Sequence, residues 1–260
     1  TILSGGNTMN NQATMEKMQT MHLGGMLHAF RELCNGTMSD AFSIDEMVAH
    51  LVDAEYDERY NKKLSRLLKN AAFRYSASFE QINFDPTRGI DRNQILRLST
   101  GDWIQKGESI IITGKTGSGK SFMACALGHK ACVLHHTVSY YNCMKLFSQL
   151  KYCKADGTYF KVMDKIKKQD LIILDDFGLN TFDSESRLML LELIEDRHGR
   201  KSLILSSQIP VKQWFDCIGN PTIADAVCDR LLHTSHKIDI DGDSLRRLKK
   251  NNSGRKLPPK

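Results

Sequence analysis

The stretch Gly114-Lys115-Thr116-Gly117-Ser118-Gly119-Lys120-Ser121 decides the fold, because it matches the pattern G-x-x-x-x-G-K-[S/T]. Residues 109–113 before it are apolar and mostly β-branched, which is typical of a buried parallel strand. Residues 122–130 after it have the composition of a helix. Strand, glycine-rich loop and helix in this order predict a phosphate-binding loop rather than a chance glycine-rich turn.

Such a loop binds phosphate through its backbone N–H groups and through the positive end of the helix that follows. Lys120 is expected to reach the β and γ phosphates, and the Ser121 hydroxyl is expected to bind Mg²⁺. The predicted nucleotide-binding residues are Gly114, Lys115, Thr116, Gly117, Ser118, Gly119, Lys120, Ser121 and Phe122.

A second chemical signal follows the apolar run 171–174, which ends in Asp175-Asp176. Parallel strands end at the edge of the sheet where ligands bind, so these acids are predicted beside the loop. Asp175 is expected to hold Mg²⁺, and Asp176 is expected to orient or deprotonate an attacking water. Asp176-Phe177-Gly178 also spells the protein-kinase magnesium motif, but the chain has no His-Arg-Asp catalytic loop.

Composition sets limits on the class of protein. The 260 residues are 41% hydrophobic, which is enough for a core, and no apolar run approaches the roughly 18 residues of a membrane span. The seven cysteines are scattered without a Cys-x-x-Cys pair, which predicts buried free thiols in a reducing cytoplasm. A net charge of +6 permits a nucleic-acid partner without proving one.

Strands and helices alternate after the loop, which predicts an α/β fold with a five-stranded parallel sheet covered on both faces. Beyond the strand at 109–113, the predicted strands are 136–141, 171–174, 202–207 and 237–240. The predicted helices between them are 144–153, 159–168, 184–197 and 223–232.

The N-terminal part is predicted to be a small helical domain that binds DNA or a partner, with one helix over 15–33 and a longer one ending at Ala71. A capping box, Ser43 to Glu46, opens the longer helix. Basic residues lie at helical spacing on its second half, where they either follow a DNA backbone or simply stabilise the helix. They are Arg59, Lys62, Lys63, Arg66 and Lys69.

These patterns divide the chain into four predicted segments. Residues 1–14 are expected to be disordered or derived from cloning, since they are polar and residues 1–8 precede Met9. The helical domain is predicted over 15–80, with its boundary near 76–84, and the ATPase domain over 81–248. Residues 249–260 are predicted to be a basic disordered tail.

Several motifs together resemble the AAA+ ATPases of the IstB/DnaC group, over about residues 15–250. They are the loop at 114–121, Leu174-Asp175-Asp176-Phe177-Gly178, Ser206-Ser207-Gln208-Ile209-Pro210 and Asp229-Arg230-Leu231. Arg88-Gly89-Ile90-Asp91-Arg92 and Gly242-Asp243-Ser244-Leu245-Arg246 are similar to segments of IstB, the ATPase that assists the IS21-type transposase. The resemblance implies an AAA+ P-loop fold of three layers, α/β/α, without a separate helical lid.

The resemblance also implies further site residues. Ser207 or Gln208 would be the polar sensor at the end of a central strand, and Arg246 would be a second sensor. Arg230 would be an arginine finger that reaches the nucleotide of a neighbouring subunit. The alternative for Arg230 is a surface ion pair with Asp225 or Asp229.

The implied function is that of an ATPase that uses ATP and Mg²⁺ to assemble on duplex DNA as a homo-oligomer. It would bend the DNA through its backbone and recruit a transposase, with no membrane partner. Two alternatives stay open. One is a replicative helicase loader of the DnaC type, and the other is a nucleotide-gated binding module with little turnover.

Overall fold

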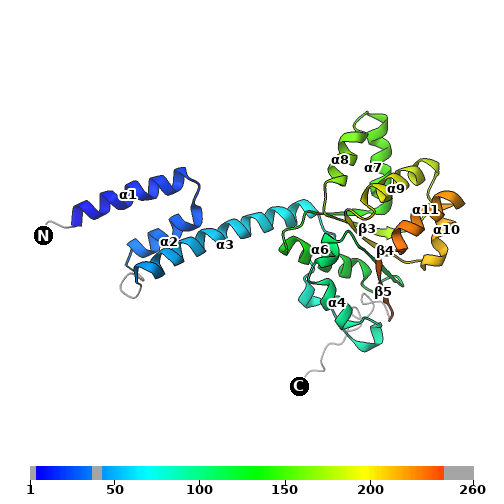
Figure 1. Cartoon of the computed structure of the whole chain (residues 1–260), viewed down its shortest axis with the longest axis horizontal. Helices are drawn as coiled ribbons and strands as arrows, with labels where there is room; N and C mark the ends of the chain where they lie inside the picture. Colours follow the sequence, from blue (N-terminus) through cyan, green and yellow to red (C-terminus); the bar gives the residue numbers. More distant parts are fainter. Residues whose placement is uncertain (1–3, 37–42, 243–260) are drawn as a thin grey trace, which may run out of the picture. The chain divides into compact units, whose positions relative to one another are not determined.

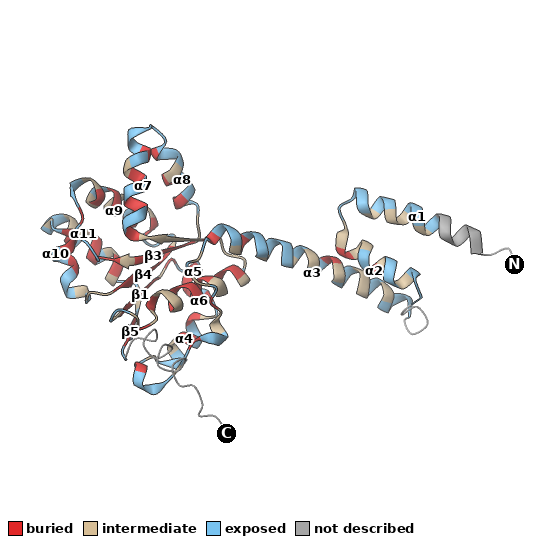
Figure 2. Cartoon of the chain, turned by 180° about the vertical axis from the view of Figure 1, so that it is seen from behind, coloured by how far each residue is buried: buried red, intermediate tan, exposed pale blue. Residues whose placement is uncertain are grey.

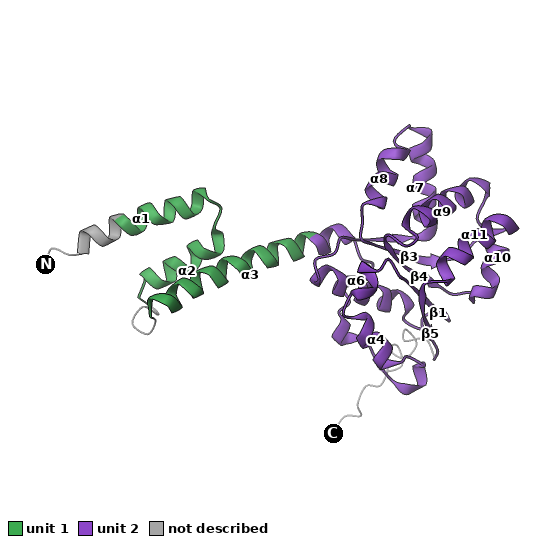
Figure 3. Cartoon of the chain, in the orientation of Figure 1, with its two compact units in different colours: residues 1–66 green, residues 67–260 purple. Residues whose placement is uncertain are grey.

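The computed structural model describes residues 4–36 and 43–242, and the side chains of residues 10–36 and 43–242 within them. The chain divides into unit 1, residues 1–66, and unit 2, residues 67–260 (Figure 3). The sequence analysis placed this boundary near residue 80. Leu67 and Ala71 are apolar and buried, and they belong to unit 2.

Unit 2 is built on one five-stranded sheet in which every pairing is parallel (Figure 1). The strands are β1 (Ser109–Gly114), β2 (Val138–Asn142), β3 (Leu171–Phe177), β4 (Ser202–Ser207) and β5 (Ser235–Ile240). Their order across the sheet is β2-β3-β4-β1-β5. The central strands are continuous apolar runs because both faces of a parallel sheet are covered. The predicted five-stranded parallel fold is therefore confirmed.

Helices cover both faces of this sheet. α6 (Lys120–Val133) contacts β1 to β4 on one face. The other face forms one apolar core with the helices α7 (Cys143–Ala155), α8 (Tyr159–Lys167), α9 (Ser184–Arg197), α10 (Trp214–Ile218) and α11 (Pro221–Leu232). Figure 2 shows the buried residues concentrated on the strands and on the inward faces of these helices. The layers are thus α/β/α, as predicted.

Short helices lie before the first strand and beside it, where the sequence analysis predicted no regular structure. They are η1 (Phe79–Gln81), η2 (Pro86–Arg88), α4 (Arg92–Leu98) and α5 (Asp102–Gln105), and a further 3-10 turn, η3 (Val211–Gln213), precedes α10. Local side-chain caps specify η2 and α4, for which periodicity is too brief to do so. The Asp85 carboxylate, for example, accepts a hydrogen bond from Thr87 N, and the Asp91 carboxylate accepts one from Asn93 N.

The described part of unit 1 is helical. α1 (Ser4–Thr20) and α2 (Gly24–Cys34) replace the single helix predicted over 15–33, because His22 has a left-handed backbone with φ of 58°. α1 also includes residues 4–14, which the sequence analysis expected to be disordered. α3 (Ile44–Ala71) begins at the predicted capping box, where Glu46 accepts a 2.7 Å hydrogen bond from Ser43 N.

All seven cysteines are free, and six of them are buried, as the scattered pattern predicted. Cys34, at the end of α2, is the exposed one. Across residues 4–36 and 43–242, no helix has the length and apolar character needed to span a bilayer.

Candidate functional site

The glycine-rich loop connects β1 to α6 at the carboxyl edge of the sheet, as predicted. The backbone of β5 passes close to its first glycine, so a Cβ at Gly114 would lie 2.3 Å from the Ile240 carbonyl oxygen. α6 begins at Lys120, directly after Gly119, so the N-terminus of a 14-residue helix faces the loop. This arrangement is the one that binds phosphate in other folds of this kind.

Lys120 is buried at the base of the loop. Its Nζ donates hydrogen bonds to the carbonyl oxygens of Gly114 at 2.8 Å and Lys115 at 2.9 Å. Burial lowers the pKa of Lys120, while the charges of Asp175 and Asp176 act in the opposite direction. Two neighbouring carboxylates therefore help to keep a buried ammonium group charged.

Asp175 ends the regular part of β3 and is completely buried. Its carboxylate accepts a 2.9 Å hydrogen bond from the Ser121 hydroxyl. It also accepts short hydrogen bonds from the hydroxyls of Ser206 and Tyr140. Burial and the charge of Asp175 raise the pKa of Tyr140, so this phenol remains a donor.

Asp176 lies where β3 bulges, and its backbone is left-handed with φ of 60°. This conformation is uncommon for a residue other than glycine and turns the side chain away from the strand's regular alternation. Its carboxylate accepts a 2.9 Å hydrogen bond from Asn142 Nδ2 and a 3.4 Å one from Gln208 Nε2. A strained acid held by two amides is typical of a functional position.

A cavity of about 760 Å³ in unit 2 brings most of the predicted residues together. The predicted residues that line it are Thr116, Gly117, Gly119, Lys120, Ser121, Phe122, Asp176 and Gln208. Gly114, Lys115 and Ser118 belong to the same loop, and Asp175 lies beneath it. The predicted pairing of loop and acids is therefore present in the structure.

Of the predicted sensor and finger residues, Ser207 and Arg230 are not among the described residues that line this cavity. Ser207 is fully buried, and its hydroxyl donates to the carbonyl oxygens of Phe177 and Ile209. Arg230 lies on α11 and forms a 3.0 Å ion pair with Glu195 of α9, not with either of the two aspartates weighed from the sequence. Arg246 falls outside the described residues.

The five basic residues predicted to bind DNA are all exposed on α3. Arg59 pairs with Glu55 at 2.6 Å, and Lys62 pairs with Glu58, each one turn away on the same helix. Lys63 and Arg66 are exposed, and within the described residues neither forms an ion pair with an acid. Lys69 is exposed in the last turn of the helix. The two ion pairs fit the helix-stabilising reading for Arg59 and Lys62, and DNA binding by the five residues stays a prediction.

The sequence analysis missed several side chains that complete the cavity. Arg74 follows α3 and lines the cavity, with Nη1 3.4 Å from Asp175 Oδ2 and 3.3 Å from Asp176 Oδ2. Arg88 also lines it and donates to the carbonyl oxygen of Ser118 in the loop. Arg74 lies in no motif. Arg88 opens the Arg88–Arg92 segment quoted above, but only the pairing of distant segments in three dimensions identifies its contact with the loop.

The residues present fit a bound Mg²⁺. Ser121 and Asp175 already share a hydrogen bond, so their oxygens lie side by side at the base of the cavity. Mg²⁺ in nucleotide sites takes one or two protein oxygens and completes its shell with phosphate and water. Within the described residues, no group of three or more His, Cys, Asp and Glu forms a metal site of its own.

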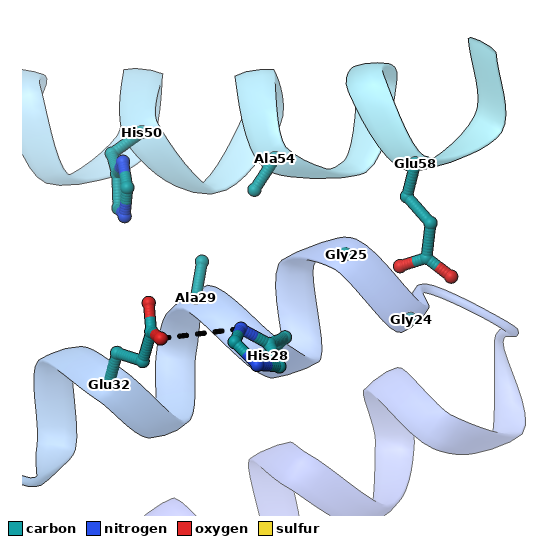
Figure 4. A pocket seen from close by; sticks show the side chains of 8 residues that line it. All are labelled: Gly24, Gly25, His28, Ala29, Glu32, His50, Ala54 and Glu58. Atoms are coloured by element: carbon teal, nitrogen blue, oxygen red, sulfur yellow. Dashed lines mark ion pairs between the residues drawn. The ribbon is translucent and has the colours of Figure 1, made fainter. Parts of the chain in front are cut away.

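A second cavity, of about 460 Å³, lies in unit 1 between α2 and α3 (Figure 4). Gly24 and Gly25 form part of its wall, and His28 lies 3.6 Å from Glu32 across one turn of α2. None of the residues predicted to bind nucleotide or metal lines it. We therefore assign the candidate site to the cavity in unit 2.

Comparisons with known proteins find similar ATP-binding proteins. A family model described as an IstB-like ATP-binding protein matches residues 16–253. The insertion sequence ATP-binding protein y4pL of Sinorhizobium fredii is 42% identical over 240 residues, which are 92% of this chain and 98% of the relative. The insertion sequence IS21 ATP-binding protein of Pseudomonas aeruginosa is 28% identical over 80% of this chain and 79% of the relative.

Solved structures share the fold at low identity. The DnaC helicase loader is 17% identical with a TM-score of 0.51, over 71% of this chain and 99% of that one. DnaA from Aquifex aeolicus, bound to AMPPCP, is 16% identical with a TM-score of 0.56, over 72% of this chain and 58% of that one. These likenesses support the AAA+ P-loop fold inferred from the sheet and the loop.

Proposed function

This chain belongs to the family of IstB-like ATP-binding proteins, and from that premise we propose that it is the Mg²⁺-dependent ATPase of an insertion sequence. The observation that carries the proposal is the cavity in unit 2, where Lys120 and Ser121 of the loop meet Asp176, with Asp175 beneath them. A binding module with little turnover has no need of Asp176, which is held in a strained conformation beside the cavity.

Each residue has a role that follows from its chemistry. Lys120 exchanges its loop carbonyl partners for the β and γ phosphates, which are stronger acceptors. Asp176 orients the attacking water and accepts its proton, while Gln208 holds the same water or the γ-phosphate. Ser121 and Asp175 would hold Mg²⁺, which neutralises charge on the phosphates when it is bound.

Assembly completes the proposed site. The cavity residues in one chain do not include Arg230, whose guanidinium pairs with Glu195 and caps the Ala226 carbonyl oxygen at 2.8 Å. We infer that Arg230 acts on the nucleotide of a neighbouring copy, where it stabilises charge in the transition state. Such a head-to-tail contact generates rings or helical filaments.

The partners are duplex DNA and an IS21-type transposase. The exposed cations of α3 support contact with the DNA backbone, which requires charge and no base-specific readout. The assembly bends the DNA and recruits the transposase, and hydrolysis resets it. The likeness to the DnaC helicase loader keeps one alternative, in which the partner is a replicative helicase.

The test measures ATP turnover and particle size with and without duplex DNA, for the wild type and for Arg230→Ala. We expect DNA to stimulate turnover and to promote large assemblies, and we expect the variant to bind ATP but to lose turnover. Arg200→Ala, at an exposed arginine beyond α9, is the matched control. A wild type that stays monomeric and ignores duplex DNA would contradict the transposition role and favour the helicase loader.

A further inference from the structure

The two acids of the site form a concentrated negative charge. Asp175 is fully buried, and the Asp176 side chain is 17% exposed. Two adjacent carboxylates with so little solvent repel each other and are costly to bury unless a cation compensates them. When no nucleotide or metal is bound, a positively charged group of the protein must balance the two carboxylates.

Most of the donors to this pair are neutral. Ser121, Ser206 and Tyr140 donate hydroxyl hydrogen bonds to Asp175. The amides of Asn142 and Gln208 donate to Asp176. These bonds orient the oxygens without adding positive charge.

Arg74 forms ion pairs with both acids, and among the described residues no other cation forms an ion pair with either. One nitrogen, Nη1, lies 3.4 Å from Asp175 and 3.3 Å from Asp176, so it bridges the pair from the cavity side. Lys120 is nearby, but its Nζ donates to loop carbonyls and is not paired with either carboxylate. Arg74 therefore supplies its charge at the Oδ2 atoms of both acids, while the Ser121 hydroxyl bonds Asp175 at Oδ1.

The contacts of Arg74 are loose. Charge-assisted hydrogen bonds are usually about 2.7–2.9 Å long, and a strong arginine–carboxylate pair uses two nitrogens. Here a single nitrogen serves both acids at longer range, and the Arg74 side chain is 42% exposed. A divalent ion that binds the acid pair more closely displaces such a group at little cost.

The backbone that carries Arg74 is well anchored, in contrast to its side chain. Ala71, the last residue of α3, is fully buried, and Ala72 turns the chain with a φ of 53°. The Phe73 ring lies against Gly128 of α6, where an added Cβ would approach within 2.7 Å of it. Arg74 is thus delivered to the acid pair by a fixed segment, and its guanidinium also lies over the Tyr75 ring, 5.5 Å from the ring centroid, so only rotation of the side chain moves it away from the acids.

We propose that Arg74 is a positioning residue that compensates Asp175 and Asp176 in place of Mg²⁺ and gives way when the metal binds. It keeps the acids from repelling the phosphates of an incoming nucleotide. The inference rests on the proposed nucleotide function of the same cavity. It also predicts a distinctive behaviour, in which Arg74 matters most for nucleotide binding when no divalent metal is present.

The experiment measures the dissociation constant of ADP by calorimetry on the full chain, once with Mg²⁺ and once with EDTA. We expect Arg74→Gln to weaken ADP binding in EDTA about tenfold and to change it less than about twofold with Mg²⁺. Arg74→Lys keeps the charge and is expected to retain most of the metal-free affinity. Arg97→Gln, at an exposed arginine of α4, is the control and should match the wild type.

Lys120→Ala distinguishes failure of this inference from failure of the proposed function, because it should weaken ADP binding in both conditions. If Lys120→Ala and the wild type bind ADP equally, or the wild type does not bind it, the nucleotide assignment and this inference both fail. If Lys120→Ala behaves as expected but Arg74→Gln loses affinity equally in both conditions, or in neither, the Arg74 inference alone is wrong. An Arg74→Lys variant as weak as Arg74→Gln in EDTA also overturns it.

Discussion

Asp176 combines an unusual backbone with a functional side chain. Its left-handed φ of 60° follows from the bulge that ends β3, and Asn142 and Gln208 fix its carboxylate. Asparagine tolerates this backbone region as well as aspartate does. An amide at this position therefore preserves the shape of the site and removes its basic oxygen.

Asp176→Asn is expected to bind ATP with near wild-type affinity and to hydrolyse it at least about 100-fold more slowly, the usual contribution of a general base. Calorimetry and a phosphate-release assay measure the two quantities. Asp176→Ala is the companion variant and should lose stability as well, because alanine is unfavourable at positive φ. Comparable turnover in Asp176→Asn and the wild type would exclude Asp176 as the base.

Ser207 and Gln208 compete for the sensor role in the sequence, and the structure gives them different surroundings. Ser207→Ala removes a buried hydroxyl that donates to two carbonyl oxygens, so we expect a loss of about 1 kcal/mol in the free energy of unfolding and an unchanged ADP affinity. Gln208→Ala removes an amide from the cavity, so we expect slower turnover at unchanged stability. Urea unfolding and turnover assays on both variants test this pair, and the reversed pattern would assign the sensor to Ser207.

At the residue scale the sequence predicted the parts of the site that lie within motifs. Lys120 and Ser121 were found because phosphate binding requires a fixed spacing within the loop, and Asp175 and Asp176 because they end an apolar strand. Ser206 lies next to the predicted sensor, yet its contact with Asp175 depends on strand register. No spacing rule identifies such a partner, since register is set by the packing of the whole sheet.

At the scale of single elements, α2 and α3 of unit 1 pack closely at one glycine. A Cβ at Gly25 would lie 2.2 Å from the Ala54 carbonyl oxygen, whereas a Cβ at Gly24 would meet the end of the Glu58 side chain. Figure 4 shows Gly25 facing Ala54 of α3, with Glu58 near Gly24. The first contact is with backbone, and the second is with a flexible carboxylate that can move.

Gly25→Ala is therefore expected to lower the free energy of unfolding of unit 1 by about 1–3 kcal/mol, as overpacking does elsewhere. Gly24→Ala, its neighbour in the chain, should be neutral or slightly stabilising because alanine favours helix. Thermal unfolding followed by circular dichroism compares the two variants. Equal melting temperatures would show that α2 and α3 are less closely packed than the structure indicates.

The start of α9 carries a pH-dependent cap. Asp183 accepts a 2.9 Å hydrogen bond from Ser186 N and an ion pair from Lys151, which together lower the pKa of Asp183 to about 2. Because this folded-state pKa lies below the usual value of 3.8, the stabilisation is complete above about pH 4 and is lost as the pH falls toward 2. Asp183→Ala should cost about 1 kcal/mol at neutral pH and progressively less below pH 4. Asp183→Asn retains a capping oxygen, so it should lower the free energy of unfolding less than Asp183→Ala does at neutral pH. Urea unfolding at several pH values measures this, and an effect of Asp183→Ala that does not change with pH would contradict a pH-dependent cap at Asp183.

The type of an element was predictable where a long pattern supports it, and its boundaries were predictable where a cap also marks its start. α9 coincides with the predicted 184–197, because Asp183 caps its start and the apolar face runs its full length. The helix predicted over 15–33 is two helices, because the chain turns at His22, just before the Gly24-Gly25 pair that weakens the helical pattern and at which α2 begins. α4 and α5 are too short for periodicity to reveal them.

At the scale of the whole molecule, alternation of strand and helix predicted the parallel sheet, because such connections place helices on both faces. Arg230 is not among the described residues that line the cavity of its own chain, and its guanidinium pairs with Glu195. The role proposed for Arg230 requires a neighbouring copy of the chain. The next prediction therefore tests a mixture of two variants.

Lys120→Ala and Arg230→Ala are each expected to be inactive, and a mixture of the two should regain turnover. Random mixing in equal amounts places an intact Lys120 opposite an intact Arg230 in about one quarter of contacts, which sets the expected recovery. Each variant mixed with wild type is the control for assembly. No recovery, with normal assembly of the mixture, would show that Arg230 does not act between copies.

The distribution of thiols has a practical consequence for following such assemblies. Cys34 is exposed at the end of α2, whereas the other six cysteines are buried, and burial raises the pKa of Cys125, Cys132 and Cys228. A maleimide dye reacts with accessible thiolate, so it should attach to Cys34 alone in the folded wild-type protein. The native chain thus carries a single labelling position in unit 1, where fluorescence anisotropy can test the proposed DNA binding and assembly without any engineered residue.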